Sequence, residues 1–298
     1  MRQFDRHIAI DWSGAKGPGL PGLQVADCPA GTLVPTVIPN PKDGHWKRSD
    51  LAQWLTLQMT GDERLLVGFD FGFAYPFCDR QAYFPDHSKT PNSRRELWAS
   101  IETICKNDRE FYGGSFYLSD NAPFADYLLY QKYRGKKYAN RFRITERECC
   151  TFGASPTCTF KCVGPDSVGI GSVAGVRFLH YLKANFQGKI AIWPFDDISL
   201  AGCVIVEVFP RLCFHLAGQN PRQWGDRNVI NATLGFFRSD PLTPMMIINK
   251  EDEADAIITS AALRSLAKEP GCWLPSKMTE RARLHEGWIF GVCDNVIV

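Results

Sequence analysis

The chain lacks several features that would assign it to a particular class of protein. It contains no run of about 18 apolar residues, so no membrane-spanning helix is expected. Its 34 basic and 32 acidic residues leave a net charge of only +2, whereas a dedicated nucleic-acid-binding domain is usually more basic. The N-terminal residues lack the apolar segment of a secretory signal, so we expect a cytoplasmic protein whose 11 cysteines are reduced.

Several catalytic and binding motifs are also missing. No Gly-x-Ser-x-Gly nucleophile motif occurs, and no Gly-x-Gly-x-x-Gly follows a strand. Cys149, Cys150, Cys158 and Cys162 lack the paired Cys-x-x-Cys spacing of structural zinc sites, and we interpret them as buried free thiols. Gly169–Ser172 precedes a helix and either presents amides to a phosphate or serves as a flexible entry to the helix.

The apolar pattern that is present predicts an α/β protein with one domain spanning residues 1–298. We expect strands at 7–13, 23–26, 32–38, 65–70, 189–193 and 203–209, and an edge strand at 288–292. The main helices are expected at 49–59, capped by Ser49, and at 172–186 and 249–267. Residues 71–163 are interpreted as a large insertion after the fourth strand. This order indicates a mixed sheet flanked by helices.

Carboxylates occur where the apolar elements end or begin. A carboxylate at the end of a buried strand is costly unless it is paired or binds a metal. Several of them at one sheet edge would raise each other's pKa, and Mg²⁺ or Mn²⁺ suits such an oxygen-rich cluster. The predicted catalytic residues and metal ligands are Asp11, Asp70, Glu207 and Asp255, with Asp252 as a further metal ligand.

Each carboxylate also has a structural interpretation. Asp11 can cap the turn that follows it, and Asp70 can accept bonds from local backbone amides. Glu207, a lone acid among Val and Ile, has no such local role. Asp252 lies in the first turn of a helix, where the macrodipole favours negative charge. Asp255 lies deeper in that helix, and we place it nearer the core.

Five short motifs follow one another along the chain: Ile8–Gly14, Gly68–Asp70, Val163–Gly164 with Gly171–Gly175, Val206–Pro210 and Asp252–Ala256. In this order they resemble domain-of-unknown-function family 429, described as predicted nucleases with a ribonuclease H-like fold. The resemblance implies a five-stranded mixed sheet whose first, fourth and fifth strands are central and carry acidic residues at their ends. Asp11, Asp70, Glu207 and Asp255 match the family's acidic positions, while Phe209 stands where Tyr is common.

A basic stretch interleaved with aromatic residues lies between Tyr127 and Glu148. Basic side chains neutralise phosphates and aromatic rings stack on bases, so this stretch points to nucleic acid. Alternatively, it is a solvated basic helix and loop with its tyrosines packed inward. The predicted substrate-binding residues are Lys132, Arg134, Lys136, Lys137, Arg141 and Arg143.

Together these observations favour a metal-dependent nuclease or phosphodiesterase that uses Mg²⁺ or Mn²⁺. A second interpretation is an actin-like or sugar-kinase-type phosphotransferase that binds ATP through the Asp11–Gly22 turn. Such proteins duplicate their core, and no second copy of this turn occurs in residues 150–298. The third interpretation is a non-catalytic domain that binds nucleic acid or protein.

Overall fold

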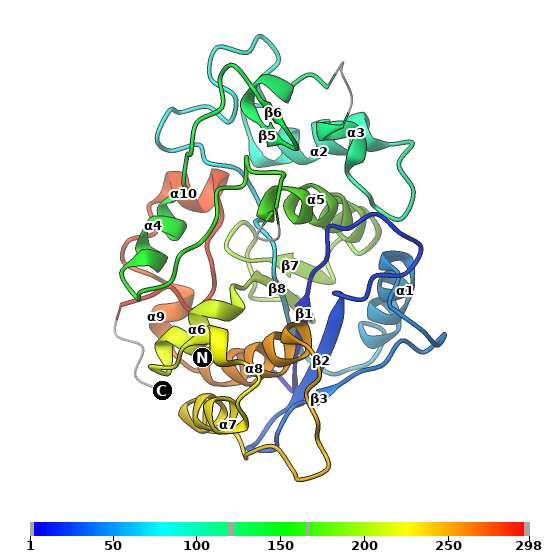
Figure 1. The fold of residues 1–298 in the computed structure, drawn as a ribbon, viewed down its shortest axis with the longest axis vertical. Helices are drawn as coiled ribbons and strands as arrows, with labels where there is room; N and C mark the ends of the chain where they lie inside the picture. The colour runs from blue at the N-terminus through cyan, green and yellow to red at the C-terminus, as the bar shows by residue number, and fades with distance from the viewer. Residues whose placement is uncertain (1–2, 119–121, 165–166, 295–298) are drawn as a thin grey trace.

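The protein contains a six-stranded mixed sheet (Figure 1). The structure is a computed structural model, and it describes residues 3–118, 122–164 and 167–294. The strand order of the sheet is β3-β2-β1-β4-β8-β7. The first three strands form an antiparallel meander, and β1, β4, β8 and β7 run parallel. The strands are β1 (Arg6–Asp11), β2 (Gln24–Pro29), β3 (Thr36–Val37), β4 (Leu65–Phe69), β7 (Ile190–Ile192) and β8 (Cys203–Glu207).

The mixed α/β sheet flanked by helices is confirmed, but the count of five strands is wrong. Ile190–Ile192 pairs with β8 and adds a sixth strand at the edge. The central strands β1, β4 and β8 are covered on both faces, which explains their nearly continuous apolar sequences. Alternate side chains enter different cores, as Ile8 and Ile10 do on one face and Ala9 on the other.

Helices cover both faces of the sheet (Figure 1). One core joins the sheet to α1 (Arg48–Gln58), α2 (Arg94–Cys105) and α5 (Val168–Asn185). The other joins it to α6 (Pro210–Leu216), α7 (Arg227–Phe236) and α8 (Glu251–Leu266). In the described ranges, no helix has both the length and the apolar character needed to cross a membrane.

The three predicted helices are present, but they begin and end at residues other than those predicted. The helix expected at 249–267 is α8, and the helix expected at 172–186 begins earlier, at Val168. Ser49 lies inside α1 instead of capping it, and its backbone amide and hydroxyl donate to the Glu110 carboxylate. The segment 288–292 is not a strand, because only Ile289 forms a bridge, to Glu207.

The segment 71–163 packs into the core beside α5 and is built mostly from short elements. Cys149, Cys158 and Cys162 are buried thiols, as predicted, but Cys150 is exposed. Besides α2, the segment 71–163 contains α3 (Gly114–Tyr117), η1 (Ala125–Tyr127), β5 (Leu129–Tyr130), β6 (Tyr133–Arg134) and α4 (Ile144–Cys150).

The C-terminal part of the chain adds the short helices α9 (Pro270–Trp273) and α10 (Glu280–His285).

Candidate functional site

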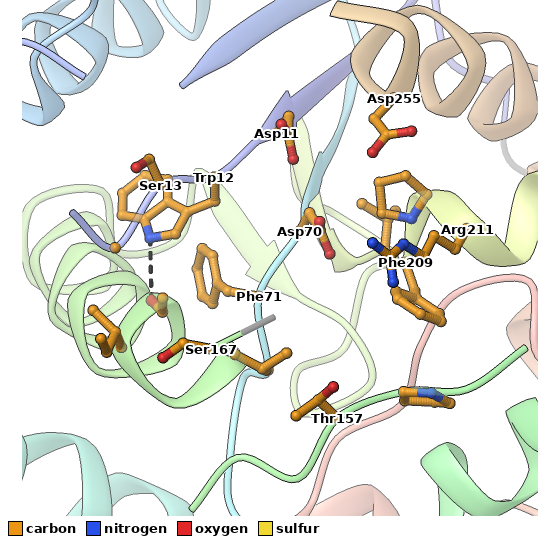
Figure 2. Close-up of a pocket in the computed structure, with 18 of the residues that line it drawn as sticks. Asp11, Trp12, Ser13, Asp70, Phe71, Thr157, Ser167, Phe209, Arg211 and Asp255 are labelled. Atoms are coloured by element: carbon orange, nitrogen blue, oxygen red, sulfur yellow. Dashed lines mark hydrogen bonds between the residues drawn. The ribbon is translucent and has the colours of Figure 1, made fainter. Parts of the chain in front are cut away.

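A pocket of about 540 Å³ opens at the carboxyl ends of the parallel strands β1, β4 and β8. Figure 2 shows Asp11, Asp70 and Asp255 at this pocket, with Trp12 and Phe71 on one side and Arg211 on another. All five predicted acidic residues line it, including Asp252 and Glu207. The carboxyl edge of a parallel sheet is a common place for a ligand site, because neighbouring strand ends bring their side chains together there.

Asp11 and Asp70 are neighbours because their strands are paired in register. Ile10 of β1 lies beside Phe69 of β4, so the next residue of each strand is an aspartate. The backbone amide of Asp70 donates to the carbonyl of Ile10 over 3.1 Å, which fixes the two Cα positions. Asp11 is buried and Asp70 is half-buried, and the charge of Asp70 adds to burial in raising the pKa of Asp11.

The helix α8 brings two more aspartates to this edge. A hydrogen bond joins the carboxyl groups of Asp252 and Asp11, and Asp255, one turn further along, faces the same pocket (Figure 2). Their spacing of three residues places them on one side of the helix. Asp11, Asp70, Asp252 and Asp255 therefore line the same pocket.

Burial and mutual repulsion hold protons on this aspartate cluster. Burial raises the pKa of Asp11 well above its ordinary value, and the charges of the neighbouring aspartates raise it further. The pKa of Asp70 rises to about 7, chiefly through burial. Burial and then the charge of Asp70 raise the pKa of Asp255. Burial also raises the pKa of Asp252. Close to neutral pH the cluster therefore shares protons among its carboxyl groups.

Arg211 supplies positive charge beside the cluster. It occupies the first turn of α6, directly after β8, and its guanidinium lowers the pKa of Asp70 and of Asp255. Its side chain is 44% exposed and lies 3.8 Å from the Glu251 carboxylate. Arg211 was not predicted from the sequence. The available signal was its position in Val206–Arg211, directly after a strand that ends at the sheet edge.

Glu207 lines the same pocket but is engaged in an ion pair, and its charge adds to burial in raising the pKa of Asp70. By strand alternation it shares the face of Ile205, and its register partner on β4 is Phe69, not Asp70. The guanidinium of Arg143 donates to both of its carboxylate oxygens, one at 2.8 Å, and the Phe73 amide donates to it at 3.0 Å. Glu207 therefore has a protein cation as its partner.

Arg143 lines the pocket and belongs to a buried network of ion pairs. Its side chain is 1% exposed, and it also contacts the Glu146 carboxylate at 2.9 Å. Its guanidinium donates to the carbonyl of Glu286, whose carboxylate accepts amide bonds from Phe77, Cys78 and Ile144. This network fixes α4 and the start of the 71–163 segment against the end of β8.

Arg141 is corrected from a substrate-binding to a structural residue. It is buried, pairs with Asp79 at 2.6 Å and donates to the carbonyls of Pro76, Ala82 and Tyr83. The other four predicted basic residues are exposed on or just after the hairpin β5–β6: Lys132, Arg134, Lys136 and Lys137. This hairpin is joined to the pocket region through a bridge between Leu129 and Lys161.

The loop after β1 is held tightly against α5. The buried side chain of Arg48 donates to the carbonyls of Ser13 and Ala15. A β-carbon on Gly14 would lie 2.5 Å from the amide nitrogen of Gly171, so only glycine allows this approach. The Trp12 indole donates to the Gly171 carbonyl over 3.1 Å. Gly169–Ser172 is thus a close-packing site for this loop.

The donor chemistry of the cluster suits a hard divalent cation. Mg²⁺ and Mn²⁺ prefer carboxylate oxygens, and such a cation relieves the repulsion that raises the pKa of Asp11. In their present placement, no three or more His, Cys, Asp or Glu side chains among the described residues form a group that could hold a metal ion.

Comparisons with known proteins identify no relative. No family model matches the chain, and no curated protein or solved structure matches it significantly.

Proposed function

We propose that the protein is a metal-dependent phosphodiesterase of ribonuclease H-like fold that acts on nucleic acid, as its resemblance to family 429 implies. The observation that carries this proposal is the cluster of Asp11, Asp70 and Asp255 on two adjacent parallel strands and a helix, in one pocket. The strand order supports it, because the antiparallel meander and the central strands β1, β4 and β8 are those expected for such a fold.

In this proposal Asp11, Asp70 and Asp255 hold the divalent cation, with Asp252 beside them. A cation of this kind activates water and stabilises the charge that develops on a phosphate oxygen. The aspartates must first lose the protons that they share, because metal ligation needs carboxylates. Glu207 is assigned a positioning role instead, since its carboxylate is already bound by Arg143.

The remaining pocket residues have roles in binding. Arg211 is placed to contact a phosphate group beside the aspartates, since its guanidinium is partly exposed in the pocket. The exposed hairpin residues, from Lys132 to Lys137, are placed to neutralise phosphates further along a bound strand. The actin-like alternative needs a duplicated core, whereas the described residues contain one large sheet.

The proposal is tested by phosphodiester cleavage with the full chain. Hydrolysis of bis(p-nitrophenyl) phosphate and of labelled single-stranded oligonucleotides is measured with Mg²⁺ or Mn²⁺. We expect metal-stimulated cleavage that Asp11→Asn abolishes, because this change removes a charge at similar volume. Asp62→Asn, at an exposed position, is the matched control. Undiminished cleavage by Asp11→Asn would reject the assignment.

A further inference from the structure

Two thiols far from the aspartate cluster lie against each other. The Sγ atoms of Cys272 and Cys293 are 2.9 Å apart. Cys272 lies in α9 and Cys293 in the segment that follows α10, so two separate elements bring them together. Cys272 is 0% and Cys293 7% exposed. The contact is therefore part of the packed interior and does not result from two mobile surface side chains.

The two thiols are not equivalent. They differ in exposure, whereas either Sγ atom can donate the hydrogen bond between them. The thiolate is the reactive form of cysteine in disulfide exchange. Cys293, the more exposed of the two, is therefore the attacking sulfur, and Cys272 is placed to resolve what forms on it.

We propose that Cys272 and Cys293 form a redox-active dithiol that a low-molecular-weight disulfide, such as glutathione disulfide, oxidises to an intramolecular disulfide. The Cys293 thiolate attacks one sulfur of the oxidant and expels the first small thiolate, which leaves a mixed disulfide. Cys272 then loses its proton to solvent, attacks the Cys293 sulfur and expels the second small thiolate. The protein loses two electrons and two protons, and the oxidant becomes two thiols.

The bond would close a loop that reaches the buried network beside the pocket. The residues between the two cysteines include Glu286, whose carboxylate holds the amides of Phe77 and Ile144. They also include Phe290, whose amide donates to the carbonyl of Glu207 over 2.8 Å. Aromatic packing already restrains both ends, since the rings of Trp273 and Phe290 are 4.7 Å apart. Oxidation would thus lock the segment that supports Glu207.

The experiment uses the full chain equilibrated in glutathione buffers with stepped ratios of reduced to oxidised form. Thiols are trapped with acid and N-ethylmaleimide, and the cysteines are mapped by peptide mass spectrometry. We expect a linked Cys272–Cys293 peptide pair and a rise in Tm of about 5 °C on oxidation. Cys150 is exposed, so we expect it to form a mixed disulfide and to report that the oxidant is active.

The wild-type chain itself gives the decisive readout, so the test does not depend on a buried substitution being tolerated. The proposal would be overturned if Cys272 and Cys293 are still alkylated, and so still reduced, at the glutathione ratio that modifies Cys150. A mixed disulfide that persists on Cys293 would overturn it equally. Cys293→Ser is expected to lose the linked pair and the rise in Tm, while the matched Cys150→Ser keeps both.

Discussion

Asp11 and Asp70 lie at the ends of two parallel strands that are paired in register, and burial and then the charge of Asp70 raise the pKa of Asp11. Their proximity follows from the register itself, because each aspartate comes directly after the paired residues Ile10 and Phe69. Neighbouring carboxyl groups with little access to water retain a proton that isolated acids would lose at neutral pH. In our account this site therefore exchanges protons for a divalent cation when the cation binds.

This arrangement predicts how stability depends on pH without metal. The pKa of Asp70 is about 7 in the folded protein, against about 3.9 for an unperturbed aspartate, so the folded state binds more protons between these values. Asp70 therefore contributes stability below about pH 4, and this contribution is lost as pH rises through 7. In urea unfolding with a chelator present, the free energy of unfolding of Asp70→Asn should rise relative to that of wild type from pH 4 to 8. A difference between the two proteins that does not change with pH would contradict this.

The ion pair between Arg143 and Glu207 predicts a different outcome. Glu207→Gln removes one of the two carboxylates that pair with the buried Arg143 and leaves only that of Glu146. This should lower the free energy of unfolding by about 3–5 kcal/mol. Mn²⁺ affinity should fall little, because Glu207 is not assigned as a ligand. Chemical unfolding and calorimetry measure the two quantities on the same sample. A stable variant that binds Mn²⁺ tenfold more weakly would make Glu207 a ligand after all.

The contrast between Asp70 and Glu207 shows what the sequence can and cannot predict. Both close an apolar run, and this alone correctly placed both at the carboxyl edge of the sheet. The face that each side chain takes depends on register between strands far apart in sequence, where Glu207 pairs with Phe69. The count of five strands came from the family resemblance, whereas the apolar pattern had already predicted the edge strand that the structure shows at Ile190–Ile192.

The basic stretch gave a mixed result for the same physical reason. Charge content identified a stretch whose Lys132, Lys136 and Lys137 are exposed, but it did not predict the hairpin β5–β6. Composition did not separate these from Arg141 and Arg143, whose partners Asp79 and Glu207 lie more than 60 residues away along the chain. The fold decides which residues so far apart in the sequence meet. The neighbouring sequence of an arginine therefore does not show that the arginine will be buried in an ion pair.

The exposed hairpin predicts the salt dependence of nucleic-acid binding. If Lys132 and Lys136 contact phosphates, Lys132→Gln/Lys136→Gln should reduce the slope of log affinity against log salt by about 1.4 for a single strand. Fluorescence anisotropy with a labelled oligonucleotide at several salt concentrations gives this slope. Lys106→Gln/Lys277→Gln, at two other exposed positions, should leave it unchanged. Equal losses in the two double variants would show that the hairpin has no special role.

Arg211 predicts a split between substrate binding and metal binding. Arg211→Met removes a partly exposed guanidinium beside the aspartates, so KM for a phosphodiester substrate should rise about tenfold or more. Mn²⁺ affinity should not fall, because the lost charge repels a cation. Arg211→Lys should restore part of the change in KM. A variant with unchanged KM would remove Arg211 from the proposed binding site.

Direct titration of the chain with Mn²⁺, followed by electron paramagnetic resonance at pH 7.5, tests the central claim that the clustered aspartates bind a divalent cation. The account predicts saturable Mn²⁺ binding by wild type, weakened at least tenfold by Asp11→Asn and by Asp70→Asn and unchanged by Asp62→Asn. Mn²⁺ binding that is equally tight in all four proteins, or not saturable in wild type, would contradict it.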